Sequence, residues 1–153
     1  MTLSPWNHIL AAYRACDLPF ELVGSGCFYF SDNLAMGWDS ARTFCKSLAA
    51  GADLAVVADC NLMHLLWNHI LAAYNGSNHW IGATDQHEEG MWVWVDGTAV
   101  TMGTPFWKYE EPNNLHEDEH CLHLNASSNG YFNDANCTLV YSFICQDPLT
   151  QVS

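Results

Sequence analysis

Carboxylates and amides crowd one segment of this sequence, between positions 108 and 134. Residues 108–121 read KYEEPNNLHEDEHC, and residues 130–134 read GYFND. Hard cations such as calcium bind about six to eight oxygen atoms from carboxylates, amide carbonyls and the backbone. The segment supplies this mixture and therefore predicts a calcium site, and its amides keep the charge low enough for a neutral ligand to share the ion. On composition alone, a solvated acidic loop is an equal alternative.

The whole chain is acidic. Its 153 residues include 4 Lys+Arg and 17 Asp+Glu, which gives a net charge of −13. So few basic side chains cannot neutralise phosphates, which argues against nucleic-acid binding, and the charge opposes contact with anionic lipids. The sequence contains no apolar run of about 18 residues, the length that a membrane span requires. The length suits one domain, the 7 Trp argue against disorder, and cations are the expected partners.

Two helices and several short strands are expected to position the acidic segment. Apolar spacing predicts one helix over 38–49 and a second over 60–74, which Asp59 or Asn61 would cap and Asn75-Gly76 would end. Strand-like runs lie at 27–30, 54–57, 80–83, 91–95, 121–124 and 141–145. Helices followed by short antiparallel strands define an α+β domain.

The 7 cysteines include no CxxC pair, which favours a disulfide framework over a zinc ribbon or a redox motif. Such a framework needs an oxidising compartment, so we expect a secreted, extracellular protein. Sequons at Asn75, Asn125 and Asn136 are compatible with that location and are the candidate glycosylation sites. The first residues, MTLSPWNH, lack the basic and apolar regions of a signal peptide, so we expect a mature chain whose signal has been removed or replaced.

The run WNHILAAY occurs twice, at 6–13 and at 67–74. Two copies do not make a solenoid, which needs about three units. The second copy falls inside a predicted helix. The first lies in an N-terminal extension, 1–15, that we interpret as a duplicated fragment or a non-native addition.

Residues 16–147 resemble a C-type lectin-like domain, with 148–153 left as a tail. Trp80-Ile81-Gly82 and the run WVWVDG at 92–97 are similar to two core strands of that family. Glu111-Pro112-Asn113 is similar to its sugar-specificity tripeptide, and Phe132-Asn133-Asp134 to its Trp-Asn-Asp, with Phe in place of Trp. The resemblance implies a disulfide-stapled α+β fold of two helices, short antiparallel sheets and a long calcium-binding loop region, with no catalysis.

The resemblance also implies ligand sets and disulfides. A principal calcium site, beside a cis peptide at Pro112, would share its residues with the sugar: Glu111, Asn113, Glu119, Asn133 and Asp134. An auxiliary calcium site would use Asp85, Glu89, Asn114 and Glu119, although His120 stands where the family has Asp, and imidazole is a poor calcium ligand. The implied disulfides are Cys16–Cys27, Cys45–Cys145 and Cys121–Cys137.

Cys60 is left without a family partner. It is interpreted as a buried thiol, as a crosslink in a homo-oligomer, or as a partner for a displaced cysteine. Its place at the start of a predicted helix favours the reactive thiolate form.

In the family, the Glu-Pro-Asn order goes with mannose, fucose and N-acetylglucosamine, and Gln-Pro-Asp with galactose. We therefore expect calcium-dependent binding of mannose-type glycans, in innate-immune recognition or agglutination of microbial surfaces. One domain binds sugars weakly, so oligomers would supply avidity. The alternative is a lectin-like domain that binds a protein, ice or mineral surface.

Two further features need an interpretation. Residues 116–120, HEDEH, match the HExxH pattern of zinc proteases, but that pattern works only on a helix, and Pro112 lies just before this segment. Chance zinc binding by His116, His120 or His123 is favoured over proteolysis. The tryptophans at 80, 92 and 94 are expected in the core, whereas Trp107 is a candidate to flank a ligand.

Overall fold

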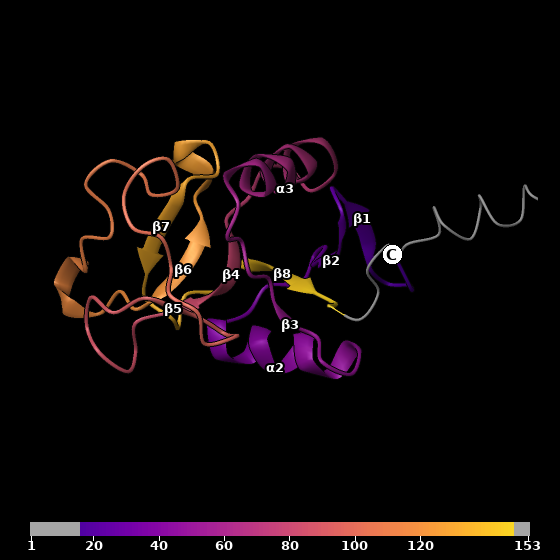
Figure 1. Ribbon diagram of the computed structural model, residues 1–153, viewed down its shortest axis with the longest axis horizontal. Helices are drawn as coiled ribbons and strands as arrows, with labels where there is room; N and C mark the ends of the chain where they lie inside the picture. Colours follow the sequence, from indigo (N-terminus) through magenta and orange to yellow (C-terminus); the bar gives the residue numbers. More distant parts are fainter. Residues whose placement is uncertain (1–15, 149–153) are drawn as a thin grey trace, which may run out of the picture.

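The structure of the protein is a computed structural model that describes residues 16–148. The extension 1–15, which holds the first WNHILAAY copy, and residues 149–153 lie outside the described residues (Figure 1). No helix within the described part is both long and apolar enough to cross a membrane.

Within the described residues, two α-helices and two 3-10 helices accompany eight strands. The helices are α2 (Trp38–Leu48), α3 (Cys60–Ala73), η1 (Leu115–Glu117) and η2 (Ala126–Ser128). The strands are β1 (Glu21–Val23), β2 (Gly26–Phe30), β3 (Asp53–Leu54), β4 (His79–Thr84), β5 (Val93–Trp94), β6 (Cys121–Leu124), β7 (Phe132–Ala135) and β8 (Ser142–Gln146).

The strands form a mixed sheet in the order β1-β2-β8-β4-β6-β7, with β3 added to β8 and β5 added to β4. The pairs are antiparallel except β4 and β8, where His79 lies opposite Ser142 and Trp80 opposite Phe143 in parallel. This parallel pair differs from the antiparallel pairing expected from the sequence. It arises because β8 enters the sheet from the far end of the chain, and only a long connection permits parallel strands.

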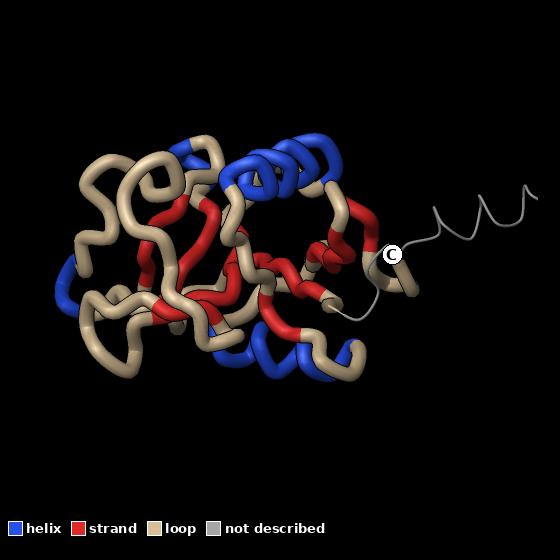
Figure 2. Tube along the Cα trace, in the orientation of Figure 1, coloured by secondary structure: helices blue, strands red, loops and turns tan. Residues whose placement is uncertain are grey.

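The two α-helices lie on opposite sides of the central strands β4 and β8 (Figures 1 and 2). On one side, Met63, Leu66 and Ile70 of α3 pack in a cluster with Trp92, Trp94, Phe106, Trp107 and Phe132. On the other side, Trp38, Ala41 and Cys45 of α2 pack with Trp80, Phe143 and Cys145. The predicted core tryptophans are therefore buried, and the long loops gather beside β6 and β7 at one end of the molecule (Figure 1).

Both predicted helices are present within a residue of their expected bounds. Asp59 caps α3, because its carboxylate accepts a hydrogen bond from the backbone N–H of Asn61 at 2.8 Å. Asn75 follows the helix with a left-handed φ of 60°, as expected of a residue that ends it.

Two strands were not among the predicted runs, and two are shorter than predicted. The two additional strands are β1 and β7. The sequence of β7 is FNDA, and its two central polar residues interrupt the apolar pattern by which a strand is predicted. The run 54–57 forms ladder pairs only through Leu54, since the N–H of Val56 donates to the side chain of Gln146 instead of to a strand. The run 91–95 is a strand only over Val93–Trp94.

The three implied disulfides are confirmed. Cys45–Cys145 joins α2 to β8, Cys121–Cys137 joins the start of β6 to the segment after β7, and Cys16–Cys27 joins the chain before β1 to β2. Among the described cysteines, Cys60 at the start of α3 is free and half-buried.

Candidate functional site

Asn133 and Asp134 lie in the middle of β7, on the strand that the sequence pattern did not reveal. They pair with His123 and Leu122 of β6, so the sheet fixes their backbone. The side chain of Asp134 is fully buried. A buried carboxylate needs charged or hydrogen-bonding partners, and the long loop supplies them.

The loop reaches Asp134 because its start runs along β7. The N–H of Phe132 donates to Phe106 at 2.8 Å, and the N–H of Lys108 donates back to Phe132 at 2.9 Å. A turn then follows, in which the N–H of Glu111 donates to the carbonyl of Lys108 at 2.9 Å. The peptide bond between Glu111 and Pro112 is cis, as expected.

Asp134 holds the tripeptide segment in place. Its carboxylate accepts hydrogen bonds from the backbone N–H groups of Asn113 at 3.3 Å and Asn114 at 2.7 Å. The two segments that carry the predicted site residues, although 20 residues apart, are therefore joined directly.

A second set of hydrogen bonds brings Glu119 to the tripeptide. The N–H of Leu115 lies 3.0 Å from both Asn113 Oδ1 and Glu119 Oε1. The N–H of Glu119 in turn donates to Asn114 Oδ1 at 3.0 Å. Asn113 and Glu119 thus present oxygens to the same small region. No sequence pattern predicts the Leu115 backbone contact, because any residue type could make it.

Two buried oxygens of the site lack a hydrogen-bond partner within the described chain: Glu111 Oε1 and Asn133 Oδ1. Buried polar atoms of folded proteins are almost always paired. Both atoms are acceptors that a cation would satisfy, so the donor chemistry here fits a hard metal ion.

The carboxylates of the site repel one another in the metal-free protein. Burial and the neighbouring carboxylates of Asp134 and Glu119 raise the pKa of Glu111 to about 7, against a weaker opposing effect of Lys108. Burial also raises the pKa of Glu119, while the hydrogen bond from Leu115 opposes the shift. A cation bound among these groups would remove the repulsion.

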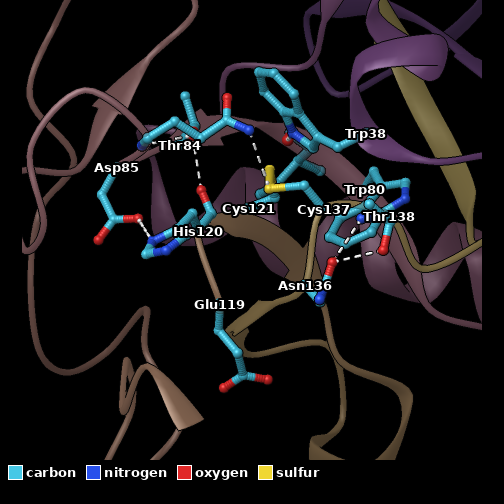
Figure 3. Close-up of a disulfide and its surroundings, with 12 residues drawn as sticks. Trp38, Trp80, Thr84, Asp85, Glu119, His120, Cys121, Asn136, Cys137 and Thr138 are labelled. Carbon is cyan, nitrogen blue, oxygen red and sulfur yellow. Dashed lines mark hydrogen bonds and ion pairs between the residues drawn. A yellow bond between two sulfur atoms is a disulfide. The ribbon is translucent and has the colours of Figure 1, made fainter. Parts of the chain in front are cut away.

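The predicted auxiliary residues are only partly together. The side chains of Asp85, Glu89 and His120 form one cluster, with His120 Nδ1 at 3.0 Å from Asp85 Oδ1 and 3.2 Å from Glu89 Oε2. Figure 3 shows His120 turned toward Asp85, whereas Glu119 points in another direction. Glu119 and Asn114 belong with the tripeptide segment instead.

The histidines of the HEDEH run do not share a helix face. His116 is exposed and has a left-handed φ of 60°, η1 ends at Glu117, and His120 turns toward Asp85. His123 is buried on β6. This segment therefore lacks the helical histidine pair that the zinc-protease pattern requires.

Trp107 lies in the core. Its side chain is 2% exposed, packs against Trp92 and Phe132, and donates its indole N–H to the carbonyl of Thr101 at 3.1 Å. It is a core residue that supports the loop.

The three sequons differ in exposure. Asn75 is exposed at the end of α3, whereas Asn125 is buried and its side-chain oxygen accepts from Ser127. Asn136 is half-buried, and its amide donates to Asp118 at 3.2 Å.

Comparison with known proteins identifies the family of this chain. The model of the lectin C-type domain family matches residues 34–147, so the chain belongs to that family, whose members are non-enzymatic binding domains. Hepatic lectin of Gallus gallus is 34% identical over 130 residues, which cover 85% of this chain and 58% of the relative. C-type lectin domain family 17, member A, of Homo sapiens is 36% identical over 137 residues, which cover 84% of this chain and 30% of the relative. The chain thus spans less than two thirds of either relative.

Solved structures share the fold. The C-type lectin CEL-I from Cucumaria echinata superposes with a TM-score of 0.77 at 23% identity, covering 86% of this chain and 96% of that chain. A second match is the cow CD23 carbohydrate-recognition domain, solved in the presence of a GlcNAc2Man3 oligosaccharide. Its TM-score is 0.73 at 25% identity, and the match covers 86% of this chain and 95% of that chain. A calcium-independent type II antifreeze protein superposes with a TM-score of 0.73 at 26% identity, covering 86% of this chain and 93% of that chain.

Proposed function

We propose that this carbohydrate-recognition domain binds calcium and that the ion holds mannose-type sugars. The ligands are Glu111, Asn113, Glu119, Asn133 and Asp134. The observation that carries the proposal is the pair of buried, unpaired oxygens, Glu111 Oε1 and Asn133 Oδ1. An unsatisfied buried acceptor costs roughly 1–3 kcal/mol, and a calcium ion would offset that cost for both.

The same residues offer what a sugar hydroxyl needs on a metal ion. Such a hydroxyl would donate to a carboxylate, Glu111 or Glu119, and accept from an amide, Asn113 or Asn133. Hydrogen bonds to charged groups are stronger than those between neutral groups. The Glu-Pro-Asn order supports mannose, fucose and N-acetylglucosamine over galactose.

The biological setting is proposed on broader grounds. Three disulfides suit an extracellular location. A single sugar site gives weak affinity, so a homo-oligomer that engages several glycans on a microbial surface would serve innate-immune recognition or agglutination.

Calorimetry tests the site directly. Calcium is titrated into the metal-free chain, and mannose is then titrated with and without calcium. We expect mannose to bind only the calcium-loaded chain, and Glu111→Gln to weaken calcium binding at least tenfold. Glu110→Gln is the matched control, because it removes the same charge from the exposed neighbouring side chain. Equal loss in both variants would count against the proposed ligand set.

The alternative is recognition of ice, a mineral or a protein. It is favoured by the structural likeness to a calcium-independent type II antifreeze protein. Ice binding that persists in chelator, with no mannose binding in calcium, would support this alternative.

A further inference from the structure

We propose that Asp85, Glu89 and His120 form a binding site for a transition-metal ion, for which zinc is the best match, in place of an auxiliary calcium site. Each residue offers one ligand atom, and the three atoms lie within 4.8 Å of one another. The proposal concerns a separate cluster and does not rest on the sugar site.

The geometry of the cluster suits a small ion. His120 Nδ1 lies 3.0 Å from Asp85 Oδ1 and 3.2 Å from Glu89 Oε2. Zinc binds nitrogen and carboxylate oxygen at about 2.0–2.1 Å in a tetrahedron, whose ligands are then about 3.3–3.4 Å apart. A zinc ion therefore needs only a few tenths of an ångström of adjustment along these two edges. Calcium sits farther from its ligands and gathers about six to eight oxygens.

The carboxylate of Asp85 is oriented to bind such an ion. Its side chain is 1% exposed, and the N–H of Gly90 donates to its Oδ2 at 3.0 Å, which leaves Oδ1 facing His120. Hydrogen bonds that fix one oxygen of a carboxylate and orient the other are typical of the surroundings of metal ligands.

His120 is equally constrained. Its carbonyl accepts from Thr84 Oγ1 at 2.7 Å and from the N–H of Asp85 at 3.1 Å, and the disulfide of Cys121 follows directly (Figure 3). The imidazole is thus held between the two carboxylates.

The chemistry of the donors selects the metal. A nitrogen ligand suits zinc and other late transition metals and is a poor ligand for calcium. The side chains of Glu89 and His120 are 54% and 31% exposed, so the ion has a path from solvent and room for a water as fourth ligand. Glu119, one residue away, points elsewhere and stays with the proposed sugar site (Figure 3).

Calorimetric titration of zinc chloride into the whole chain, at pH 7.5 with saturating calcium, tests the proposal. We expect one zinc per chain, bound at least tenfold more weakly by His120→Asn and unaffected by His64→Asn, which changes an exposed histidine on α3. His120→Asp should lose zinc in the same way and gain a second calcium. Thermal unfolding serves as the control that each variant is folded. The zinc measurement can be interpreted whether or not the proposed sugar site binds calcium.

Three results would overturn the site: no zinc binding, equal zinc binding by the wild type and His120→Asn, or a second calcium in the wild type that is lost in Asp85→Asn. The first would mean that a proton alone holds His120 between the carboxylates, and the second that zinc binds other surface histidines.

Discussion

Burial, together with the nearby carboxylates of Asp134 and Glu119, raises the pKa of Glu111 to about 7. Calcium needs the ionised carboxylate, so protons compete with it, and affinity falls as the pH drops through this range. At pH 7 we expect about half a proton to be released for each calcium bound, and at pH 5 we expect calcium to bind about 50-fold more weakly than at pH 7.

Calorimetry in buffers of different ionisation enthalpy measures that release, and pH 8.5, where Glu111 is already ionised, serves as the control. Calcium binding that releases no proton at pH 7 would mean that Glu111 is not a ligand.

The order of carboxylate and amide in the tripeptide should set sugar preference. The double variant Glu111→Gln with Asn113→Asp keeps one carboxylate and one amide but exchanges their places. We predict a shift of at least tenfold toward galactose, measured by competition of free sugars against immobilised glycan. A variant that still binds calcium and still prefers mannose would disprove this role for the tripeptide.

Single residues could be assigned from the sequence only where their types are diagnostic. Glu111 and Asn113 are proposed because Glu111-Pro112-Asn113 resembles the sugar-specificity tripeptide of the family. The family resemblance placed His120 in one site with Asp85 and Glu89, but its ion pairs with them depend on how two segments distant in the sequence meet. The buried state of Glu111 Oε1 likewise depends on packing that no local pattern records.

At the scale of elements, the turn before β7 is tied to α3 through Gly130. This residue has a left-handed φ of 83°, and a Cβ there would lie 2.3 Å from the ring of Trp67. Gly130→Ala should therefore destabilise the fold by on the order of 3 kcal/mol, from backbone strain plus displacement of a buried indole.

Gly97→Ala is the matched control, because Gly97 has a φ of 88° with no atom near the added Cβ. It should cost only about 1 kcal/mol. Equal losses for the two variants in chemical denaturation would show that the Trp67 contact is unimportant.

The end of α3 also carries the sequon best placed for a glycan. Asn75 is exposed, whereas Asn125 is buried and Asn136 is engaged with Asp118. If the chain is expressed in a secreting eukaryotic cell, we predict glycan at Asn75 and less than one tenth of that occupancy at the other two. Peptide mass spectrometry measures all three, and full occupancy at Asn125 would contradict the packing of η2.

Helices were easier to predict than strands, for a physical reason. Both helices bury a face whose apolar residues recur along the sequence, and Asp59 supplies a local cap. β7 has no such local signature, because the polar residues Asn133 and Asp134 occupy its central positions. The parallel pairing of β4 and β8 depends on a contact between segments far apart in the sequence, so no local sequence pattern predicts it.

For the whole molecule, two buried histidines should make stability depend on pH. Burial lowers the pKa of His79 and of His123 to about 4, from 6.5. The unfolded chain therefore binds more protons between these values, so the contribution of the two histidines to stability is complete above pH 6.5 and falls as the pH drops toward 4. Each histidine accounts for about 3 kcal/mol of this change.

Denaturant titrations of the calcium-free protein at pH 4.5 and 7 measure the effect. Replacing both histidines with Gln should reduce the pH dependence, whereas replacing the exposed His87 should leave it unchanged. The comparison with wild type is needed because the raised pKa of Glu111 acts in the opposite sense, its stabilisation being lost as pH rises through about 7. An unchanged slope in the double variant would show that these histidines do not titrate on unfolding.

The central claim is that an ion in the long loop holds a mannose-type sugar, and an affinity column tests it most directly. The purified chain is passed over immobilised mannose in calcium and eluted with chelator, free mannose or free galactose. We predict retention that requires calcium and yields to chelator and mannose but not to galactose. A chain that binds calcium yet passes through the column, or one retained equally in chelator, would contradict the proposed sugar site.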